Sequence, residues 1–231
     1  MKKIHRFFYD FKIVDNVINI NDLEIVNQIK NVLKLKISEK LILFFDNKEV
    51  LCSVDSINKK FINCNVLKEN NKSILSENNI ILYCAILKKN NFELIVQKAS
   101  EIGISKIVPI LTERTIKTNL NFDRLNKIAK EACEQAERSN VIVVSDVMKF
   151  KDCLNINSDL NFLFDFSGDE FNNFKINKKN KSVSLFIGPE GGFTDNEVKL
   201  AKNNDFIIAR LGKNVLRGET AAIIASYLLV N

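Results

Sequence analysis

Residues 186–194 read FIGPEGGFT and residues 211–221 read LGKNVLRGETA, and these two stretches decide the architecture of the chain. Each follows an apolar run typical of a buried strand, and each continues into a helical pattern. Five of the seven glycines of the chain lie in these two stretches. A chain this poor in glycine places it where the backbone turns sharply or approaches a ligand closely. We therefore expect the two loops to form one site.

Strands and helices alternate around these loops. We expect strands at residues 80–87, 106–111, 141–144, 162–164, 183–187 and 206–211, and helices at residues 90–103, 122–139, 194–204 and 219–229. This alternation predicts a mostly parallel sheet covered on both faces, with ligands outside the carboxyl ends of its strands. Both glycine loops lie at such an edge. Residues 155–181 are rich in Asn, Asp and Lys, and we expect much of this segment to form exposed loop.

Residues 1–69 differ because short strands predominate there. We expect strands at residues 5–8, 17–20, 40–45, 49–57 and 61–67, with turns at 46–47 and 58–59. Such a series predicts a small β-barrel domain. Asn21 is a candidate cap for a helix over residues 22–32. Residues 68–79 are polar enough for a linker, which places the domain boundary near residues 70–75.

Composition narrows the classes of function. The chain has 34 Lys and Arg against 28 Asp and Glu, and this net charge of +6 permits a polyanionic partner without requiring one. The five cysteines form no C-x-x-C pair, so reduced thiols in a cytoplasmic protein are expected. The single histidine, His5, excludes a site that needs two imidazoles. We expect neither a membrane span nor a signal peptide.

The first loop has the features of a backbone-mediated ligand site. Gly188, Gly191 and Gly192 leave backbone groups open to a ligand, and Thr194 with Glu197 forms a capping box that begins the next helix. The loop lacks the G-K-[ST] end of a P-loop and the G-x-G-x-x-G dinucleotide pattern. ATP hydrolysis and an ordinary dinucleotide site are therefore disfavoured, although a glycine-rich turn without any ligand has the same sequence.

The second loop places charge at a helix start. Arg217, Glu219 and Thr220 begin this helix, where the helix dipole favours Glu219 and where Glu219 or Thr220 can cap. A capped helix with a solvent-exposed arginine is the simpler interpretation. Two loops of this kind on adjacent strand ends favour a shared ligand.

Several ordered motifs give the chain a family resemblance. They are G-P-E-G-G-F at residues 188–193, L-G at 211–212, L-R-x-E-T-A at 216–221, H-R-F-F at 5–8, Q-K-A-S-E-I-G at 97–103, P-x-x-T-E-R at 109–114 and E-A-x-x-Q-x-x-R at 131–138. The chain resembles the RsmE family of the SPOUT superfamily, bacterial methyltransferases that act on N3 of a uridine in 16S rRNA. Gly218 departs from the Thr, Ser or Ala usual in that family, and the proline usual after the E-A-x-x-Q-x-x-R helix is missing from residues 139–144.

The alternation of strands and helices alone predicts an ordinary open α/β sheet. The resemblance implies a more specific fold. It implies an α/β protein with a PUA-like, RNA-binding β-barrel over residues 1–72 and a SPOUT methyltransferase domain over residues 73–231. The SPOUT domain would contain a mostly parallel sheet and a deep trefoil knot, whose loops bind S-adenosylmethionine. The family works as a homodimer on 16S rRNA in the small ribosomal subunit, without membrane or metal.

The resemblance also implies the site residues. Cofactor contacts are expected from Phe164, Gly188, Glu190, Gly191, Gly192, Leu211, Gly212, Leu216, Thr220 and Ala221. Catalytic roles are expected for Arg217, as a cation that stabilises uridine without its N3 proton, and for Glu219, as a base or as a cap. RNA contacts are expected from His5, Arg6, Arg114 and Arg138, with Lys2 and Lys3 as further phosphate contacts.

Three other functions stay open. A related enzyme would methylate another RNA position, such as a ribose 2′-oxygen or a guanine. A non-enzymatic RNA-binding module would bind RNA without the cofactor. A metabolic enzyme with a nucleotide at the glycine loops would act without RNA and show little salt dependence.

Overall fold

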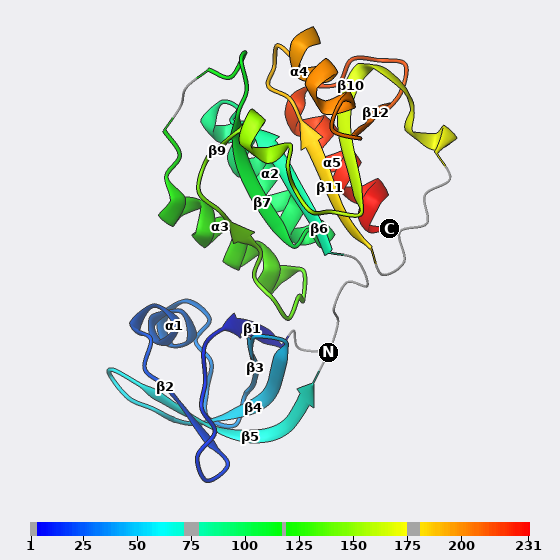
Figure 1. Cartoon of the computed structure of the whole chain (residues 1–231). Helices are drawn as coiled ribbons and strands as arrows, with labels where there is room; N and C mark the ends of the chain where they lie inside the picture. Colours follow the sequence, from blue (N-terminus) through cyan, green and yellow to red (C-terminus); the bar gives the residue numbers. More distant parts are fainter. Residues whose placement is uncertain (1–3, 72–78, 117–118, 175–180) are drawn as a thin grey trace. The chain divides into compact units, whose positions relative to one another are not determined.

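The computed structural model describes residues 4–71, 79–116, 119–174 and 181–231 (Figure 1). The chain divides into two compact units. Unit 1 contains residues 1–75 and 133–141, and unit 2 contains residues 76–132 and 142–231. Unit 1 therefore combines two stretches that are far apart in the sequence.

Unit 1 is built on a five-stranded sheet. Its strands are β1 (His5–Phe8), β2 (Val17–Ile20), β3 (Lys40–Phe45), β4 (Lys48–Ile57) and β5 (Ile62–Asn71). They run in the order β1-β3-β4-β5-β2, with β1 parallel to β3 and the other pairs antiparallel. The β3–β4 hairpin turns at Asp46 and Asn47, whose φ angles of 45° and 63° suit a two-residue hairpin loop. All five strands predicted for this region are confirmed to within a few residues.

The helix of unit 1 differs from its prediction. Helix α1 (Leu23–Asn27) passes directly into a π-helical segment, η1 (Gln28–Val32). Its N-cap is Asp22 and not Asn21, because the Asp22 side chain accepts hydrogen bonds from the N–H groups of Glu24 and Ile25. The helix packs its buried side chains into the core formed by the strands.

Unit 2 is built on a parallel sheet. Its strands are β6 (Asn79–Ala85), β7 (Lys106–Leu111), β8 (Val143–Val144), β9 (Met148–Lys149), β10 (Leu160–Glu170), β11 (Ser182–Ile187) and β12 (Ile207–Arg210). They run in the order β12-β10-β11-β6-β7-β8, with β9 beside β7, and each of these pairings is parallel. The predicted parallel sheet is confirmed.

Helices cover both faces of this sheet. They are α2 (Lys89–Ile102), α4 (Asp195–Lys202) and α5 (Gly218–Val230), with 3-10 turns η2 (Phe150–Cys153) and η3 (Phe171–Asn173). A further helix, α3 (Phe122–Gln135), begins in unit 2, and its residues 133–135 belong to unit 1. Side chains of η2 and α4 share a core cluster with one face of the central strands. Helices α2 and α5 pack against each other, and α5 also packs on β6 and β11. Figure 1 shows both on the far side of the sheet.

Two predictions for unit 2 need correction. The strand predicted at residues 162–164 is longer, since β10 runs from Leu160 to Glu170 and η3 follows it, so less of the described part of 155–181 is loop than expected, although residues 166–170 stay partly or fully exposed. Helix α3 ends at Gln135 instead of residue 139, and Glu137 beyond it has a φ of 57° that no helix continues through. Most of the predicted linker, residues 72–78, lies outside the described residues.

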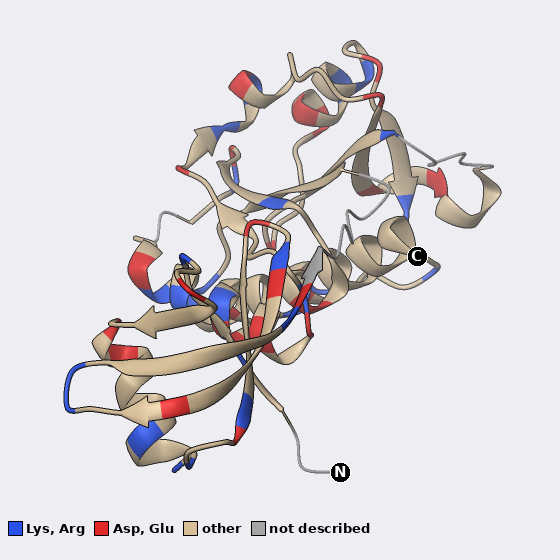
Figure 2. Ribbon diagram, turned by 90° about the horizontal axis from the view of Figure 1, so that it is seen from below, with Lys and Arg blue, Asp and Glu red and all other residues tan. Residues whose placement is uncertain are grey.

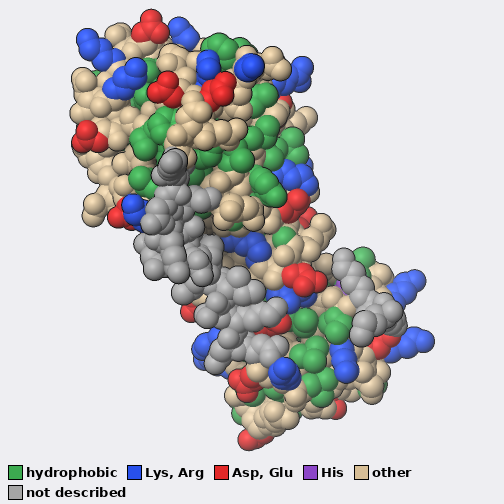
Figure 3. Space-filling view, turned by 90° about the vertical axis from the view of Figure 1, so that its right-hand side faces the viewer, with side chains coloured by type: hydrophobic (Ala, Val, Ile, Leu, Met, Phe, Trp, Pro, Cys, Tyr) green, Lys and Arg blue, Asp and Glu red, His purple; other side chains and the backbone are tan. Residues whose placement is uncertain are grey.

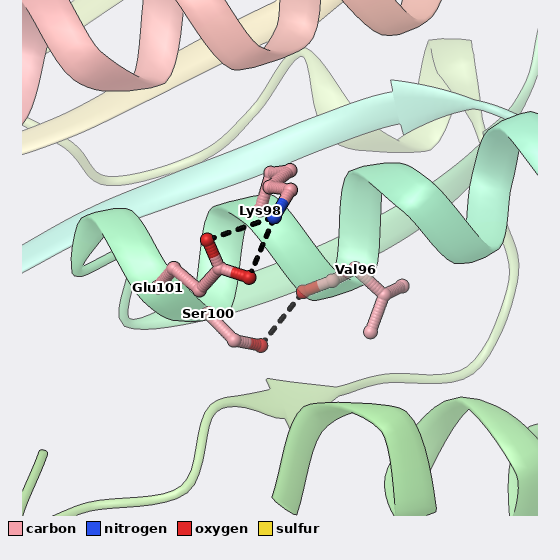
Figure 4. A network of polar contacts seen from close by, with 4 residues as sticks. All are labelled: Val96, Lys98, Ser100 and Glu101. Atoms are coloured by element: carbon pink, nitrogen blue, oxygen red, sulfur yellow. Dashed lines mark hydrogen bonds and ion pairs between the residues drawn. The ribbon is translucent and has the colours of Figure 1, made fainter. Parts of the chain in front are cut away.

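Helix α2 carries the Q-K-A-S-E-I-G motif, whose polar side chains make contacts within the helix (Figure 4). Lys98 Nζ donates to both carboxylate oxygens of Glu101, at 2.8 Å and 3.0 Å, and Ser100 Oγ donates to the Val96 carbonyl at 2.7 Å. Gly103 ends the helix in the left-handed region with a φ of 119°, as predicted. The charges of this motif are thus paired along the helix surface.

All five cysteines are buried free thiols. Burial raises the pKa of Cys52 and Cys64 to about 12 and the pKa of Cys153 to about 11, and it raises the pKa of Cys84 as well. Within the described ranges, no three His, Cys, Asp or Glu side chains gather as they would around a metal ion. The cysteines therefore act as small core side chains.

Charged residues are spread over both units. In Figure 2, segments of Lys and Arg alternate with segments of Asp and Glu on the ribbons. Among the described residues, no helix has both the length and the hydrophobicity that crossing a bilayer requires.

Candidate active site

An open pocket lies at the carboxyl ends of the strands of unit 2. Its volume is about 620 Å³, within the range of small-molecule sites. The lining residues come from the ends of β10, β11 and β12, from the segment after β6 and from the start of α5. The predicted edge of the sheet is therefore where the cavity is found.

The first glycine loop leads from β11 into α4. The N–H of Gly192 donates to the Pro189 carbonyl at 2.8 Å, and Gly192 has a φ of 68°. The predicted capping box is confirmed, since Thr194 and Glu197 each hydrogen-bond to the backbone N–H of the other. These bonds fix the turn of the loop and its junction with α4.

The second glycine loop leads from β12 into α5. Arg217 is the N-cap residue of α5, and its carbonyl accepts from the Ala221 N–H at 2.8 Å. Gly218 is buried, and a Cβ added there would lie 3.0 Å from Leu87 Cδ1. The departure from the family motif at this position therefore lets the start of α5 pack closely against Leu87.

Most of the predicted cofactor residues line this pocket, and two do not. The lining residues among them are Phe164, Gly188, Glu190, Gly192, Leu211, Gly212, Leu216 and Ala221. Gly191 faces Arg114 instead, because a Cβ at Gly191 would lie 3.3 Å from Arg114 Cδ. Thr220 lies in the first turn of α5 and is not among the lining residues.

Arg217 and Glu219 both line the pocket, but they differ in their hydrogen bonds. Glu219 Oε2 accepts from Asn91 Nδ2 at 3.2 Å. The exposed Arg217 side chain has no hydrogen-bond partner in the described part of the chain. The other pocket arginine, Arg210, donates to Glu170 at 3.3 Å. Arg217 is therefore a cation that is open to a ligand.

The sequence interpretation missed pocket residues on two segments. Lys88 and Asn91 follow β6, and Asp165 and Phe166 lie in β10. Phe166 is 52% exposed, and Val215 of the second loop is 81% exposed, so both are apolar groups at an open site. The rule that parallel strands end at one edge could have found Lys88 and Asn91, whereas Phe166 fell in a stretch interpreted as loop.

The structure gives Arg6 a role other than the predicted RNA contact. Arg6 is only 9% exposed, its Nη2 donates to Glu49 Oε2 at 2.8 Å, and its guanidinium lies 5.1 Å from the Phe44 ring centroid. The same nitrogen donates to the Arg138 carbonyl at 3.4 Å. A phosphate cannot reach a buried and paired guanidinium, so we assign Arg6 to the stability of unit 1.

The remaining predicted RNA contacts have different surroundings. His5 lies half-buried on β1, and Arg138 lies half-buried in unit 1, where burial lowers the pKa of its guanidinium. Arg114 follows β7 in unit 2, and its Nη1 donates to the carbonyls of Gly191 and Phe193 at 2.7 Å and 3.3 Å. Lys2 and Lys3 lie outside the described residues.

Comparison with known families gives two matches. A model of an RNA methyltransferase domain matches residues 75–230. A model of an RNA methyltransferase PUA domain matches residues 20–67, within the β-rich region of unit 1. Together they cover both units.

Individual relatives agree with the family models. A protein of Rickettsia conorii named ribosomal RNA small subunit methyltransferase E is 32% identical, over 96% of this chain and 93% of the relative. A putative methyltransferase from Legionella pneumophila, solved with bound cofactor SAM, has a TM-score of 0.88 and 26% identity over 98% of this chain and 97% of its own. A ribosomal RNA small subunit methyltransferase E from Neisseria gonorrhoeae, solved with S-adenosyl methionine, has a TM-score of 0.88 and 25% identity with the same coverage.

Proposed function

Because this chain belongs to the ribosomal RNA small subunit methyltransferase E (RsmE) family, we propose that it methylates N3 of a uridine in 16S rRNA, using S-adenosylmethionine. The observation that carries the proposal is the pocket formed by the two glycine loops, with the open cation Arg217 at its edge. The family match supports rRNA of the small subunit as the substrate. The choice of 16S rRNA and of uridine N3 rests on the motif resemblance.

The pocket fits a cofactor of this size and polarity. Gly192 and Gly212 line it, and a Cβ added at either residue would meet no atom within 4 Å. Side chains at these positions would therefore project into open space of the cavity. Its backbone-rich wall offers N–H and C=O groups to the adenosyl and amino acid parts of S-adenosylmethionine. When bound, this cofactor supplies a methyl group activated by a sulfonium.

Arg217 is the residue that we propose to activate the target base. Neutral uridine N3 is a poor nucleophile, and loss of its proton leaves negative charge on the uracil ring. Arg217 lies at the N-terminus of α5, so its guanidinium and the positive end of the helix dipole both favour an anion at this edge of the pocket. The helix N-terminus is in place before the reaction begins, and the Arg217 side chain is free to turn toward the base.

Glu219 has a positioning role in this proposal. Its carboxylate is held by Asn91 of α2, and it lies in the first turn of α5, where negative charge is favoured. This contact ties the start of α5 to the start of α2 across the pocket. Asn91 and Glu219 thus keep the second loop, and Arg217 with it, in place.

The proposed partner of the protein, besides rRNA, is a second copy of the chain. Helix α5 is hydrophobic on nearly all sides, and its Ile223, Ile224 and Leu228 are only half-buried while Tyr227 is 59% exposed. Hydrophobic side chains also gather on the part of unit 2 seen in Figure 3. A helix that is hydrophobic all round is normally covered, which supports a homodimer through this helix.

The two domains divide the work in this proposal. Residues 1–72 form the PUA-like domain that holds rRNA, and residues 73–231 form the SPOUT domain that binds the cofactor, transfers the methyl group and dimerises. The target base must leave its stack to enter the pocket. We place the reaction in the cytoplasm, where the small subunit is assembled.

The test is a comparison of rRNA from a strain that lacks the gene with rRNA from its parent. Mass mapping should show the loss of a single N3-methyluridine from 16S rRNA, and the purified protein with S-adenosylmethionine should restore it. Loss of a ribose or guanine methyl group instead would assign another RNA target. Binding of rRNA without any binding of S-adenosylmethionine would replace the enzyme by an RNA-binding module.

A further inference from the structure

We propose that Arg114 is a positioning residue for the cofactor, because it clamps the first glycine loop to the end of β7 together with Glu197. This inference rests on the proposed function, in which S-adenosylmethionine occupies the pocket. It gives Arg114 a task other than the phosphate contact that its charge suggests.

The first contact is made by the guanidinium of Arg114. Its Nη1 donates to the Gly191 carbonyl at 2.7 Å and to the Phe193 carbonyl at 3.3 Å. These carbonyls lie on either side of Gly192, which lines the pocket. A single guanidinium nitrogen therefore holds the peptide unit that precedes Gly192 and the one that follows Phe193.

The second contact is the carboxylate of Glu197, which is 1% exposed. Its Oε1 accepts from the Glu113 N–H at 2.9 Å, and its Oε2 accepts from the Thr194 N–H at 2.9 Å. One buried carboxylate thus joins the residue before Arg114 to the end of the glycine loop. A buried carboxylate is stable only with such donors, so its two bonds hold both segments in register.

The strand order makes these contacts a tie across the sheet. The glycine loop follows β11 and Arg114 follows β7, and β6 lies between these strands. The backbone N–H of Lys88, just after β6, also donates to Glu190 at 3.4 Å. Three neighbouring strand ends are therefore joined through one loop, whose shape decides that of the pocket wall.

Gly191 supports the clamp independently. It lies outside the pocket lining, and a Cβ there would lie 3.3 Å from Arg114 Cδ and 3.6 Å from Arg114 Cβ. The absence of a side chain at Gly191 makes room for Arg114 and not for the cofactor. The G-P-E-G-G-F motif and the T-E-R motif therefore contact each other through Gly191 and Arg114.

The experiment compares the full-length Arg114→Gln variant with an Arg124→Gln control. Arg124 is also exposed and paired, with Glu93, and lies outside the pocket, so the control loses the same charge. By calorimetry, Arg114→Gln should bind S-adenosylmethionine at least tenfold more weakly, and its KM for the cofactor should rise while kcat at saturation stays near wild type. The melting temperature without cofactor and the binding of 16S rRNA should match the control.

A phosphate contact by Arg114 predicts the opposite result. The affinity for rRNA would then fall, its log–log salt slope would shrink by about 0.7 to 0.9, and cofactor affinity would stay unchanged, which would overturn the clamp. Failure of the wild-type protein itself to bind S-adenosylmethionine would count against the proposed function. The two failures are thus distinguishable.

A second variant covers the case in which Arg114→Gln does not fold. Gly191→Ala adds only the Cβ that presses on Arg114, and it should weaken cofactor binding several-fold. Where Arg114→Gln does fold, the same substitution in its background should add little, because the clamp is already lost. Unchanged cofactor affinity in Gly191→Ala, or a fully additive loss in the double variant, would contradict the inference.

Discussion

The loop glycines differ in what their missing side chain makes room for. At Gly192 and Gly212 a Cβ would meet open pocket space, at Gly191 it would meet Arg114, and at Gly218 it would meet Leu87. The same residue type therefore leaves space at the pocket and a positive φ at two positions, and makes room for protein packing at the other two. Each position calls for a different kind of mutational test.

Replacing Arg217 should affect catalysis and leave the fold intact. Arg217→Ala removes an exposed side chain, so unfolding should be unaffected, whereas kcat should fall by about 100-fold to 1,000-fold because a group that stabilises developing charge is lost. Methyl transfer to small subunits or their rRNA measures this effect. Lys213→Ala in the same loop, whose side chain is exposed and outside the pocket lining, is the matched control. Equal rates for the two variants would remove Arg217 from the mechanism.

The five thiols should be unreactive in the folded protein. Burial raises the pKa of Cys52 and Cys64 to about 12 and of Cys153 to about 11, and it raises the pKa of Cys84. The thiolate is the reactive form, so the raised pKa values disfavour reaction of these four thiols at pH 8, and burial blocks access to all five. An aromatic disulfide reagent should therefore titrate all five cysteines only after unfolding in guanidinium. Rapid reaction of any native cysteine would contradict the buried positions.

At the scale of elements, the packing of the first turn of α5 depends on the close approach of Leu87 to Gly218. Gly218→Ala places a Cβ 3.0 Å from Leu87 Cδ1, and this overpacking should cost about 1–3 kcal/mol of unfolding free energy. Denaturant unfolding measures the cost. Leu87→Val with Gly218→Ala should recover part of it, since the shorter side chain leaves room. If the single Gly218→Ala variant were as stable as wild type, this close packing would not be limiting.

A helix or strand could be predicted from the sequence where the residues that determine it are neighbours in the sequence. Strands β3 and β7 have the predicted bounds because apolar runs between turn residues mark them, and the capping box at Thr194 and Glu197 is a short-range pattern. Strand β10 was missed beyond residues 162–164 because its Asp and Ser residues resemble loop and because Phe166, in the missed part, is 52% exposed, unlike the buried Phe162 and Phe164.

The site was predictable in outline but not in its contacts. Glycine spacing and strand order place both loops at one edge of the sheet, and eight of the ten proposed cofactor residues line the pocket. The roles of Arg6 and Arg114 could not be inferred, because a positive charge in a sequence does not reveal whether a carboxylate or a carbonyl lies beside it. Their partners are distant in sequence.

For the whole molecule, the exposed side of α5 predicts the oligomeric state. Tyr227→Asp places a charge on this side and should convert a dimer into single chains of 26.4 kDa, as measured by light scattering after gel filtration. Val143→Asp, on β8, is the control because Val143 is exposed to a similar extent, 57% against 59% for Tyr227. Dimers that persist in Tyr227→Asp would place the interface elsewhere. The trefoil knot implied by the family resemblance stays a prediction.

Residues that meet at the pocket are far apart in the sequence, and this separation affects how the protein folds into its active form. Lys88 and Glu190, which meet there, are 102 positions apart, and Asn91 and Glu219 are 128 apart. Parallel strands that are so far apart in sequence can pair only after a large loop has closed, and the entropy cost of closure comes before any stabilising contact forms. Folding is therefore slow, and the partly folded chain exposes strand edges. During refolding, the helical signal should accordingly return well before cofactor binding does. The partly folded state with an incomplete pocket is the one that a chaperone would most need to protect.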